Sequence, residues 1–126
     1  MKQKASCVLS VDRNNKVLAV SRKDNFYDFC LPGGKVDHGE SELDAAIREL
    51  KEETGLDILR IKKEPVFIYE VFYEDQTHEV HVFEAEVKGE INSKEGLNVQ
   101  WLYPSEFLTC TFGESNRKIF KHVGLF

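Results

Sequence analysis

The stretch from residue 31 to residue 56 constrains the fold most, because it sets a strongly patterned helix between glycine-rich breakers. Ser41 suits the N-cap, and Asp44 follows three residues later as an acidic variant of the capping box. Four apolar residues recur at the spacing of one buried helix face: Leu43, Ala46, Ile47 and Leu50. Gly55 suits the position that ends a helix. The pattern predicts a helix over residues 41–54 that packs one stripe against a core.

Three glutamates near the end of this helix, Glu49, Glu52 and Glu53, stand at i, i+3 and i+4. We expect their carboxylates to project from one face within a single turn, away from the apolar stripe and toward solvent. Like charges at this spacing cost an isolated helix about 0.2–0.5 kcal/mol per pair. A hard divalent cation removes that penalty, and Mg²⁺ keeps coordination sites for phosphate oxygens. The cluster therefore predicts a metal site, with a solvated acidic helix face as the alternative.

The residues around the acidic turn suit a supporting role. Arg48 can reach Glu52 at i+4 or a carboxylate in the preceding loop, and Glu40 lies close enough to join the cluster. Gly33 and Gly34 allow either a close approach of the backbone to a neighbour or a positive φ angle. We therefore interpret Arg48 as a residue that orients a metal ligand.

The rest of the chain reads as strands before and after this helix. Residues 5–11 and 16–21 are β-branched runs around a turn at 12–15 and predict a hairpin, whereas 22–30 reads as a loop. Three later segments predict strands: 65–73, 79–87 and 98–103. The end of the chain predicts a helical turn at 105–108 and a helix over 114–123. This order indicates an α/β (α+β) sandwich with a mixed sheet.

Composition limits the class of protein. A chain of 126 residues with 41% hydrophobic and 31% charged residues is typical of a single globular domain, here taken as residues 1–126. No apolar run is long enough for a membrane span or a signal peptide, so we expect a cytoplasmic protein without a membrane partner. The net charge of −5 disfavours a nucleic acid polymer as partner, but a metal ion can still hold a small phosphorylated substrate. The oligomeric state stays open.

The acidic segment resembles the signature of the Nudix hydrolase family, which places a glycine, a glutamate, an Arg-Glu pair, a Glu-Glu pair and a final glycine at set intervals. The matching residues are Gly34, Glu40, Arg48, Glu49, Leu50, Glu52, Glu53, Gly55 and Leu56. The resemblance implies an α/β/α sandwich with a mixed central β-sheet. It also implies hydrolysis of a nucleoside diphosphate linked to a second moiety, with Mg²⁺, or alternatively Mn²⁺, as cofactor.

The resemblance also assigns roles by position. Glu49, Glu52 and Glu53 would be catalytic metal ligands, with Glu53 or a neighbour placing the attacking water. Gly34 would offer backbone groups to the metal site, and Arg48 would be an orienting residue. Which glutamate acts as the base stays open.

Outside the signature the chain is most similar to the MutT branch, which hydrolyses purine nucleoside triphosphates such as dGTP and 8-oxo-dGTP to the monophosphate and pyrophosphate. By this resemblance Glu95 would be a fourth metal ligand, although an exposed loop acid is an equal alternative. Arg22 and Lys23 would contact phosphate, or be plain surface charges. Asn116 would hydrogen-bond the purine base, or cap the last helix.

Several functional hypotheses stay open at this stage. The first is a purine nucleoside triphosphate pyrophosphohydrolase that binds its small nucleotide substrate through metal. The second keeps the fold and metal but acts on ADP-ribose, another nucleotide sugar or a dinucleoside polyphosphate, and the position of Tyr73 is similar to a tyrosine of the last class. The third is a nucleotide-binding module without catalysis. His78 falls in a predicted turn, where we expect it to face solvent.

Overall fold

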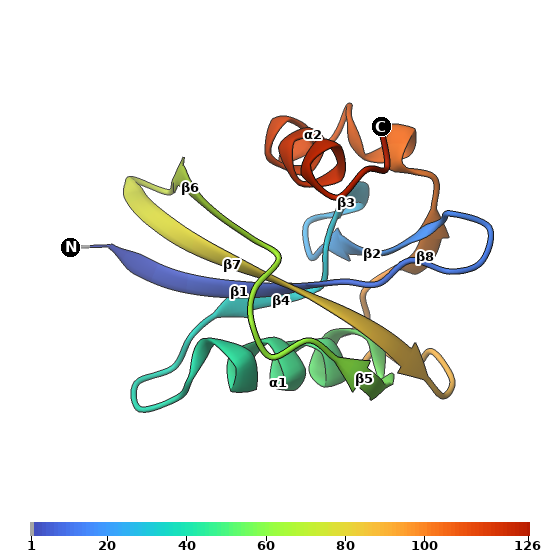
Figure 1. Cartoon of the computed structure of the whole chain (residues 1–126), viewed down its shortest axis with the longest axis horizontal. Coiled ribbons are helices and arrows are strands. Elements are labelled where there is room, and N and C mark those ends of the chain that lie inside the picture. The colour runs from blue at the N-terminus through green and yellow to red at the C-terminus, as the bar shows by residue number, and fades with distance from the viewer. Residues whose placement is uncertain (1) are drawn as a thin grey trace.

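The computed structural model describes residues 2–126 as a layered α+β fold, with α1 on one side of a sheet and α2 on the other (Figure 1). Along the chain the elements are β1 (Gln3–Leu9), β2 (Val17–Arg22), β3 (Asn25–Cys30), β4 (Gly33–Lys35), α1 (Glu42–Thr54), β5 (Asp57–Ile61), β6 (Phe67–Tyr73), β7 (Gln76–Lys88), β8 (Val99–Leu102), the 3₁₀ turn η1 (Pro104–Phe107) and α2 (Gly113–His122). Within residues 2–126, no helix is long and apolar enough to cross a membrane.

The larger sheet is built around β7, a strand of 13 residues. Its strands run in the order β4-β1-β7-β5, and β6 also pairs with β7. β1 and β7 are parallel, with Ala5 opposite Val80, whereas the other pairs are antiparallel. The length of β7 lets β6 pair with its first half and β5 with its last residues. The sheet is therefore mixed, as predicted.

The predicted hairpin between 5–11 and 16–21 is wrong beyond its turn. The Asp12 side chain closes that turn by accepting hydrogen bonds from the backbone amides of Asn14 at 2.8 Å and Lys16 at 2.9 Å. Beside the turn, the two arms are joined by the Val11–Val17 bridge and by a hydrogen bond from the Leu18 amide to the Ser10 carbonyl at 3.0 Å. β1 then enters the larger sheet, whereas β2 joins a second sheet in the order β3-β2-β8. Longer pairing with distant strands therefore outcompetes the local hairpin.

Two further predictions need correction. Residues 22–30 are not a loop throughout, because β3 pairs with β2 across a register shift near Ser21. The Pro-Gly-Gly segment is not only a breaker, since Gly33 and Gly34 form most of β4 opposite Cys7 and Ser6. Periodicity misses both strands because β3 is polar and aromatic and β4 is three residues long. β5 was not predicted at all.

The remaining elements follow the prediction within a few residues. β6, β7, β8, η1 and α2 fall on the predicted strands, turn and helix. The turn between β6 and β7 shrinks to Glu74 and Asp75, whose φ angles are 51° and 62°. Positive φ at both central residues is the geometry of a two-residue hairpin turn.

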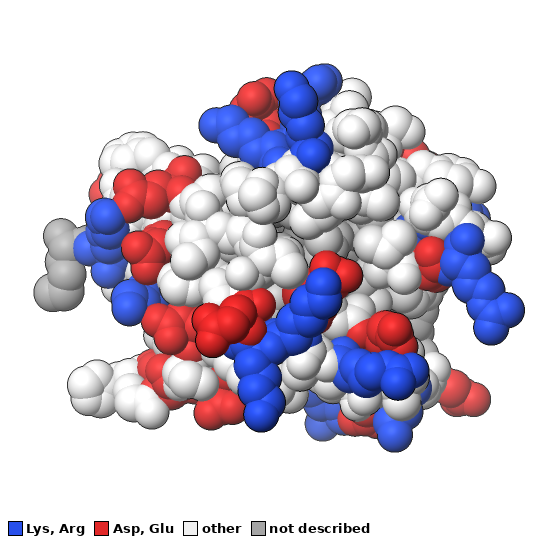
Figure 2. All heavy atoms as spheres, viewed as in Figure 1, with Lys and Arg blue, Asp and Glu red and all other residues white. Residues whose placement is uncertain are grey.

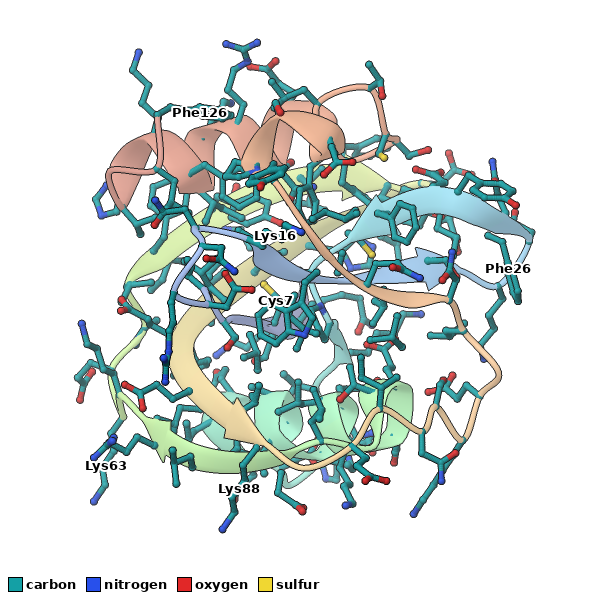
Figure 3. All side chains as sticks on the ribbon, turned by 90° about the vertical axis from the view of Figure 1, so that its right-hand side faces the viewer. Cys7, Lys16, Phe26, Lys63, Lys88 and Phe126 are labelled. Atoms are coloured by element: carbon teal, nitrogen blue, oxygen red, sulfur yellow. The ribbon has the colours of Figure 1, made fainter. Side chains whose placement is uncertain are left out.

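Two apolar layers hold the sandwich together, as the predicted α/β/α arrangement requires. The layer on the α1 side includes the fully buried Ala46 and Leu50, packed with Val8 and Phe83 of the larger sheet. The layer on the α2 side includes Cys7, which lies near the centre of the molecule (Figure 3). Because both faces of β1 are buried, this strand fixes the position of β4 and of α1 relative to the sheet.

Candidate functional site

Helix α1 begins and ends where the sequence predicts, which sets the rotation of its acidic face. The Ser41 hydroxyl accepts a hydrogen bond from the Asp44 amide at 3.0 Å. Gly55 adopts a φ of 78° and donates its amide to the Lys51 carbonyl at 2.9 Å. A Cβ atom at Gly55 would lie 2.4 Å from the Asn92 carbonyl oxygen, so glycine also makes room for the following loop.

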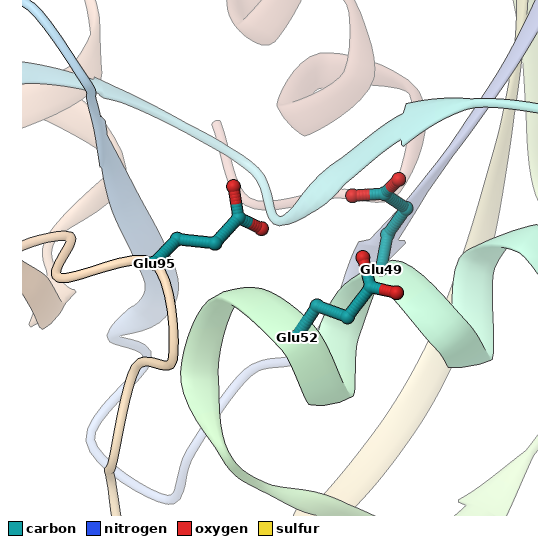
Figure 4. A group of neighbouring side chains, drawn as sticks. All are labelled: Glu49, Glu52 and Glu95. Carbon is teal, nitrogen blue, oxygen red and sulfur yellow. The ribbon is translucent and has the colours of Figure 1, made fainter.

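The structure gathers Glu49, Glu52 and Glu95 into one acidic cluster, in which a carboxylate oxygen from each residue lies within 4.8 Å of the others (Figure 4). Glu49 and Glu52 come from α1, and Glu95 comes from the loop between β7 and β8. All three residues are partly buried. Several carboxylate oxygens at this spacing are the donor set that hard divalent cations such as Mg²⁺ prefer, so the cluster fits such an ion.

The loop that carries Glu95 is attached to the carboxyl end of α1. The Asn92 amide donates to the Thr54 carbonyl at 2.8 Å, and the Lys94 amide donates to the Glu52 carbonyl at 3.2 Å. The last carbonyls of a helix have no partner within the helix, so these bonds satisfy groups that would otherwise need water. The same bonds bring Glu95, about 40 residues later in the chain, beside the acidic turn of the helix.

Arg48 makes both of the contacts that the sequence left open. Its Nε and Nη2 atoms donate to the two carboxylate oxygens of Glu40 at 2.8 and 3.0 Å. Its Nη1 donates to Glu49 at 2.9 Å and to Glu52 at 3.3 Å, and Nη2 also reaches the Lys35 carbonyl. The guanidinium lowers the pKa of Glu40 to about 2, so Glu40 stays ionised and holds Arg48 in place.

The charges around this cluster are mixed rather than purely acidic. Acidic and basic side chains gather over the lower part of the face shown in Figure 2, where α1 lies. Lys23 contributes to the balance, since its Nζ lies 3.0 Å from a Glu95 carboxylate oxygen. The ion pair with Glu95 raises the pKa of Lys23. Arg48 and Lys23 therefore offset part of the repulsion among the glutamates.

Glu53 departs from the prediction that all three helical carboxylates face solvent. It lies seven residues after the buried Ala46, which places it on the side of the helix that faces the sheet. Its Oε1 accepts a hydrogen bond from the Gly33 amide at 2.7 Å. Burial is the main cause that raises the pKa of Glu53 to about 8. Glu53 therefore stands between β4 and the acidic cluster rather than within the cluster.

The two glycines of β4 allow a close approach of β1 at Gly33 and of the Glu49 side chain at Gly34, and neither has a positive φ. A Cβ atom at Gly33 would lie 2.2 Å from the Ser6 carbonyl oxygen of β1. A Cβ atom at Gly34 would lie 2.6 Å from the Glu49 carboxyl carbon. Of the two explanations offered by the sequence, close approach is the one that the structure bears out.

A cleft of about 470 Å³ adjoins the acidic cluster, between the larger sheet, β3 and α2. Glu53 and Gly34 line it together with Phe112 and Asn116. Asn116 is only 3% exposed, and its Nδ2 has no hydrogen-bond partner within residues 2–126. The alternative that Asn116 caps the last helix is wrong, because the N-cap of α2 is Phe112. A buried donor without a partner is costly, so this amide is suited to a ligand in the cleft.

Arg22 and His78 lie where the sequence did not place them. Arg22, for which the resemblance implies a phosphate contact, donates to the Tyr73 hydroxyl and pairs with Asp24. His78, expected in solvent, is 8% exposed, lines the cleft and forms a 3.1 Å hydrogen bond between Nε2 and the Tyr73 carbonyl. Extending the alternation of Val80 by two residues would have identified His78 as inward-facing.

Comparison with known proteins identifies the family to which this fold and this site belong. Residues 1–123 match the model of the NUDIX domain. The chain therefore belongs to the NUDIX family, as its signature residues indicated. It is also similar in fold to a MutT protein from Methanosarcina mazei Go1, with a TM-score of 0.79, 20% identity and coverage of 97% of this chain and 95% of that one.

Two curated relatives are similar in sequence over part of their length. A Bacillus subtilis protein provisionally named an 8-oxo-dGTP diphosphatase is 34% identical over 101 residues, which are 77% of this chain and 64% of that protein. An ADP-ribose pyrophosphatase from Methanocaldococcus jannaschii is 48% identical over 48 residues, which are 36% of this chain and 28% of that protein. The matches thus span less than two thirds of either relative.

Replacing Gly55 with alanine should lower stability and weaken metal binding together. The positive φ alone costs about 1–2 kcal/mol for a residue with a Cβ atom, and contact with Asn92 would also displace the loop that carries Glu95. Gly124→Ala is the matched control, since Gly124 has a φ of 83° and open space around its Cβ position. Urea denaturation and calorimetric titration with Mg²⁺ measure the two effects. Equal losses of stability with unchanged Mg²⁺ affinity would contradict the role given to this glycine.

Replacing Glu53 with glutamine should change how stability depends on pH in the metal-free protein. The folded pKa of about 8 lies above the ordinary value of 4.5, so the wild type loses stability as pH rises between these values. Glutamine removes that loss, and we expect the variant to gain about 2–4 kcal/mol relative to wild type between pH 5 and pH 9. Urea denaturation in the presence of EDTA at both pH values provides the test. Parallel pH profiles of the two proteins would show that Glu53 is not held in its protonated form.

Proposed function

We propose that this chain hydrolyses the diphosphate linkage of a nucleoside diphosphate joined to a second group, and that purine nucleoside triphosphates are its preferred class. The products would be the nucleoside monophosphate and pyrophosphate. The observation that carries the proposal is that a cleft with an unpartnered buried amide at Asn116 opens beside three gathered carboxylates. The volume of about 470 Å³ lies in the range of small-molecule sites.

The acidic cluster would hold the divalent cation of the reaction. Glu49, Glu52 and Glu95 would provide carboxylate oxygens to Mg²⁺, or alternatively Mn²⁺, with Glu53 and the Gly34 backbone adjoining. When bound, Mg²⁺ supplies charge neutralisation at the diphosphate and lowers the pKa of its water. Arg48 would contribute by holding the Glu49 and Glu52 carboxylates in one orientation.

Glu53 is our candidate for the group that takes a proton from the attacking water. One of its oxygens is held by the Gly33 amide, and the residue lines the cleft beside the cluster. A base works best when its pKa lies near the working pH, and burial moves the pKa of Glu53 to about 8. Lys23, which pairs with Glu95 in the free protein, lies close enough to the cluster to meet a substrate phosphate.

Asn116 would recognise the base. Its amide carries both a donor and an acceptor, so it can bond to one edge of a purine. Its position in α2 is fixed by a backbone bond to Phe112 at 2.9 Å, and its Nδ2 lacks a protein partner within residues 2–126. A base acceptor at Nδ2 would satisfy this group.

ADP-ribose is the second candidate substrate, and the name of the Methanocaldococcus jannaschii relative favours it. Cleavage of ADP-ribose would use the same metal and carboxylates. The acidic cluster therefore does not distinguish ADP-ribose from purine nucleoside triphosphates as the substrate. A module that binds nucleotide without catalysis is the third candidate, but none of the signature carboxylates is missing. A substrate panel distinguishes all three.

We predict Mg²⁺-dependent hydrolysis of dGTP and 8-oxo-dGTP to the monophosphate and pyrophosphate, in a panel that also holds ADP-ribose and a dinucleoside polyphosphate and is read by chromatography of the nucleotide products. Glu52→Gln should lower kcat by roughly 10²–10⁴-fold, since it removes a charged oxygen from the acidic cluster. Glu90→Gln is the matched control, because it makes the same chemical change on an exposed residue that is not a member of the cluster. Turnover of ADP-ribose alone would transfer the proposal to the second substrate. Binding of nucleotide without any turnover would support the third candidate.

Replacing Asn116 with alanine should lower kcat/KM for purine substrates and leave kcat/KM for pyrimidine substrates unchanged. Loss of one neutral hydrogen bond of about 0.5–1.5 kcal/mol lowers kcat/KM by roughly two- to tenfold. Kinetics on dGTP and dCTP, with a thermal unfolding curve for each protein, measure the effect. An equal loss on both bases would mean that Asn116 acts only through packing.

A further inference from the structure

The neighbouring cations Arg22 and Lys23 contact different parts of the site. The Lys23 ammonium lies 3.0 Å from a Glu95 carboxylate oxygen, on the side of the acidic cluster. Arg22 instead donates from Nη2 to the Tyr73 hydroxyl, and its guanidinium carbon lies 5.4 Å from the centre of the Tyr73 ring. Successive residues at the end of a strand point to opposite sides, so the two cations separate at this point.

Arg22 belongs to a group of flat side chains, Arg22, Tyr73 and Phe112, that we call the base wall. Its guanidinium carbon lies 5.7 Å from the centre of the Phe112 ring, and the Tyr73 and Phe112 ring centres are 5.1 Å apart. All three residues line the cleft. Planar guanidinium and aromatic groups offer surfaces on which a nucleobase can stack.

The charge of Arg22 is already balanced inside the protein. Its Nε lies 3.4 Å from an Asp24 oxygen and 3.6 Å from an Asp28 oxygen. Asp28 in turn accepts from the Thr111 amide at 2.8 Å, which ties the residue before Phe112 to β3. These contacts hold the base wall before any ligand binds, which lowers the entropic cost of binding.

The base wall faces the same cleft as the unpartnered amide of Asn116. Phe112 and Asn116 are four residues apart on α2 and therefore lie on one face of the helix. Both line the cleft, and only the deeper residue, Asn116, is buried. The Tyr73 and Phe112 rings are tilted by 54° to each other, so the cleft offers several planar groups for stacking and a polar group for the base edge.

We propose that Arg22 is a base-binding residue that stacks, with Tyr73 and Phe112, against the base of the substrate, while Lys23 meets the phosphates. This inference rests on the proposed function, since it divides the nucleotide between two regions of the same site. It differs from the sequence-based expectation that both cations contact phosphate.

The test uses two probes that each carry half of a nucleotide, followed by chemical-shift titration of the full chain. Guanosine supplies base and ribose without phosphate, and methylenediphosphonate with Mg²⁺ supplies phosphate groups without a base. Arg22→Ala and Arg22→Lys should both lower the affinity for guanosine roughly five- to tenfold. Lysine keeps the charge of arginine but, like alanine, lacks the planar group. Both variants should leave diphosphonate affinity within about twofold, which also shows that the site is still folded.

Lys23→Ala is the matched variant. We expect it to lower the affinity for the diphosphonate and to leave the affinity for guanosine unchanged. Equal weakening of both probes by Arg22→Ala, or recovery of guanosine affinity in Arg22→Lys, would overturn the assignment. Turnover of the nucleotide panel by the wild type with guanosine affinity unchanged in Arg22→Ala would reject this inference and leave the proposed function intact. A wild type that binds guanosine through Arg22 but hydrolyses nothing in the panel would reject the proposed function alone.

Discussion

The close contact between β4 and α1 is the constraint on which the site depends. Gly33 gives its amide to Glu53 at 2.7 Å, and Gly34 leaves the space that the Glu49 carboxylate occupies. A side chain at Gly33 would clash with Ser6 and Cys7 of β1, and a side chain at Gly34 would displace the Glu49 carboxylate. β4 pairs with β1, and β1 pairs along β7. The contact of β4 with α1 therefore fixes where the Glu49 and Glu53 carboxylates lie relative to the central sheet.

Neighbouring cationic side chains offset part of the negative charge on the acidic turn of α1. Arg48 binds Glu40 through two hydrogen bonds and reaches toward Glu49 and Glu52 with its remaining nitrogen. Lys23 pairs with Glu95 from the opposite side. Such contacts offset part of the repulsion among the carboxylates, whose oxygens are the donor set that a hard divalent cation prefers.

The cleft divides into regions of different chemistry, which suits a ligand with a charged part and a flat apolar part. Glu53 and the glycines of β4 lie beside the acidic cluster, whereas Phe112 and Asn116 belong to α2. The two helices cover opposite faces of the sheet (Figure 1). Each nevertheless contributes a residue to the lining of the cleft, Glu53 from α1 and Asn116 from α2. Only the fold brings them to the same cleft.

The amino-acid sequence alone determined α1, its caps at Ser41 and Gly55 and the shared face of Glu49 and Glu52, because these depend on contacts within four residues. It also carried the family signature. Tertiary structure decided what depends on distant segments: the divergence of β1 from β2, the arrival of Glu95 beside the helix and the direction of Arg22. Glu53 shows the boundary between the two, since the helical spacing places it on the face of Ala46 but only the Gly33 amide explains how its carboxylate is held there. Local spacing fixes a side chain's angle around a helix, whereas long-range pairing decides what that side chain meets.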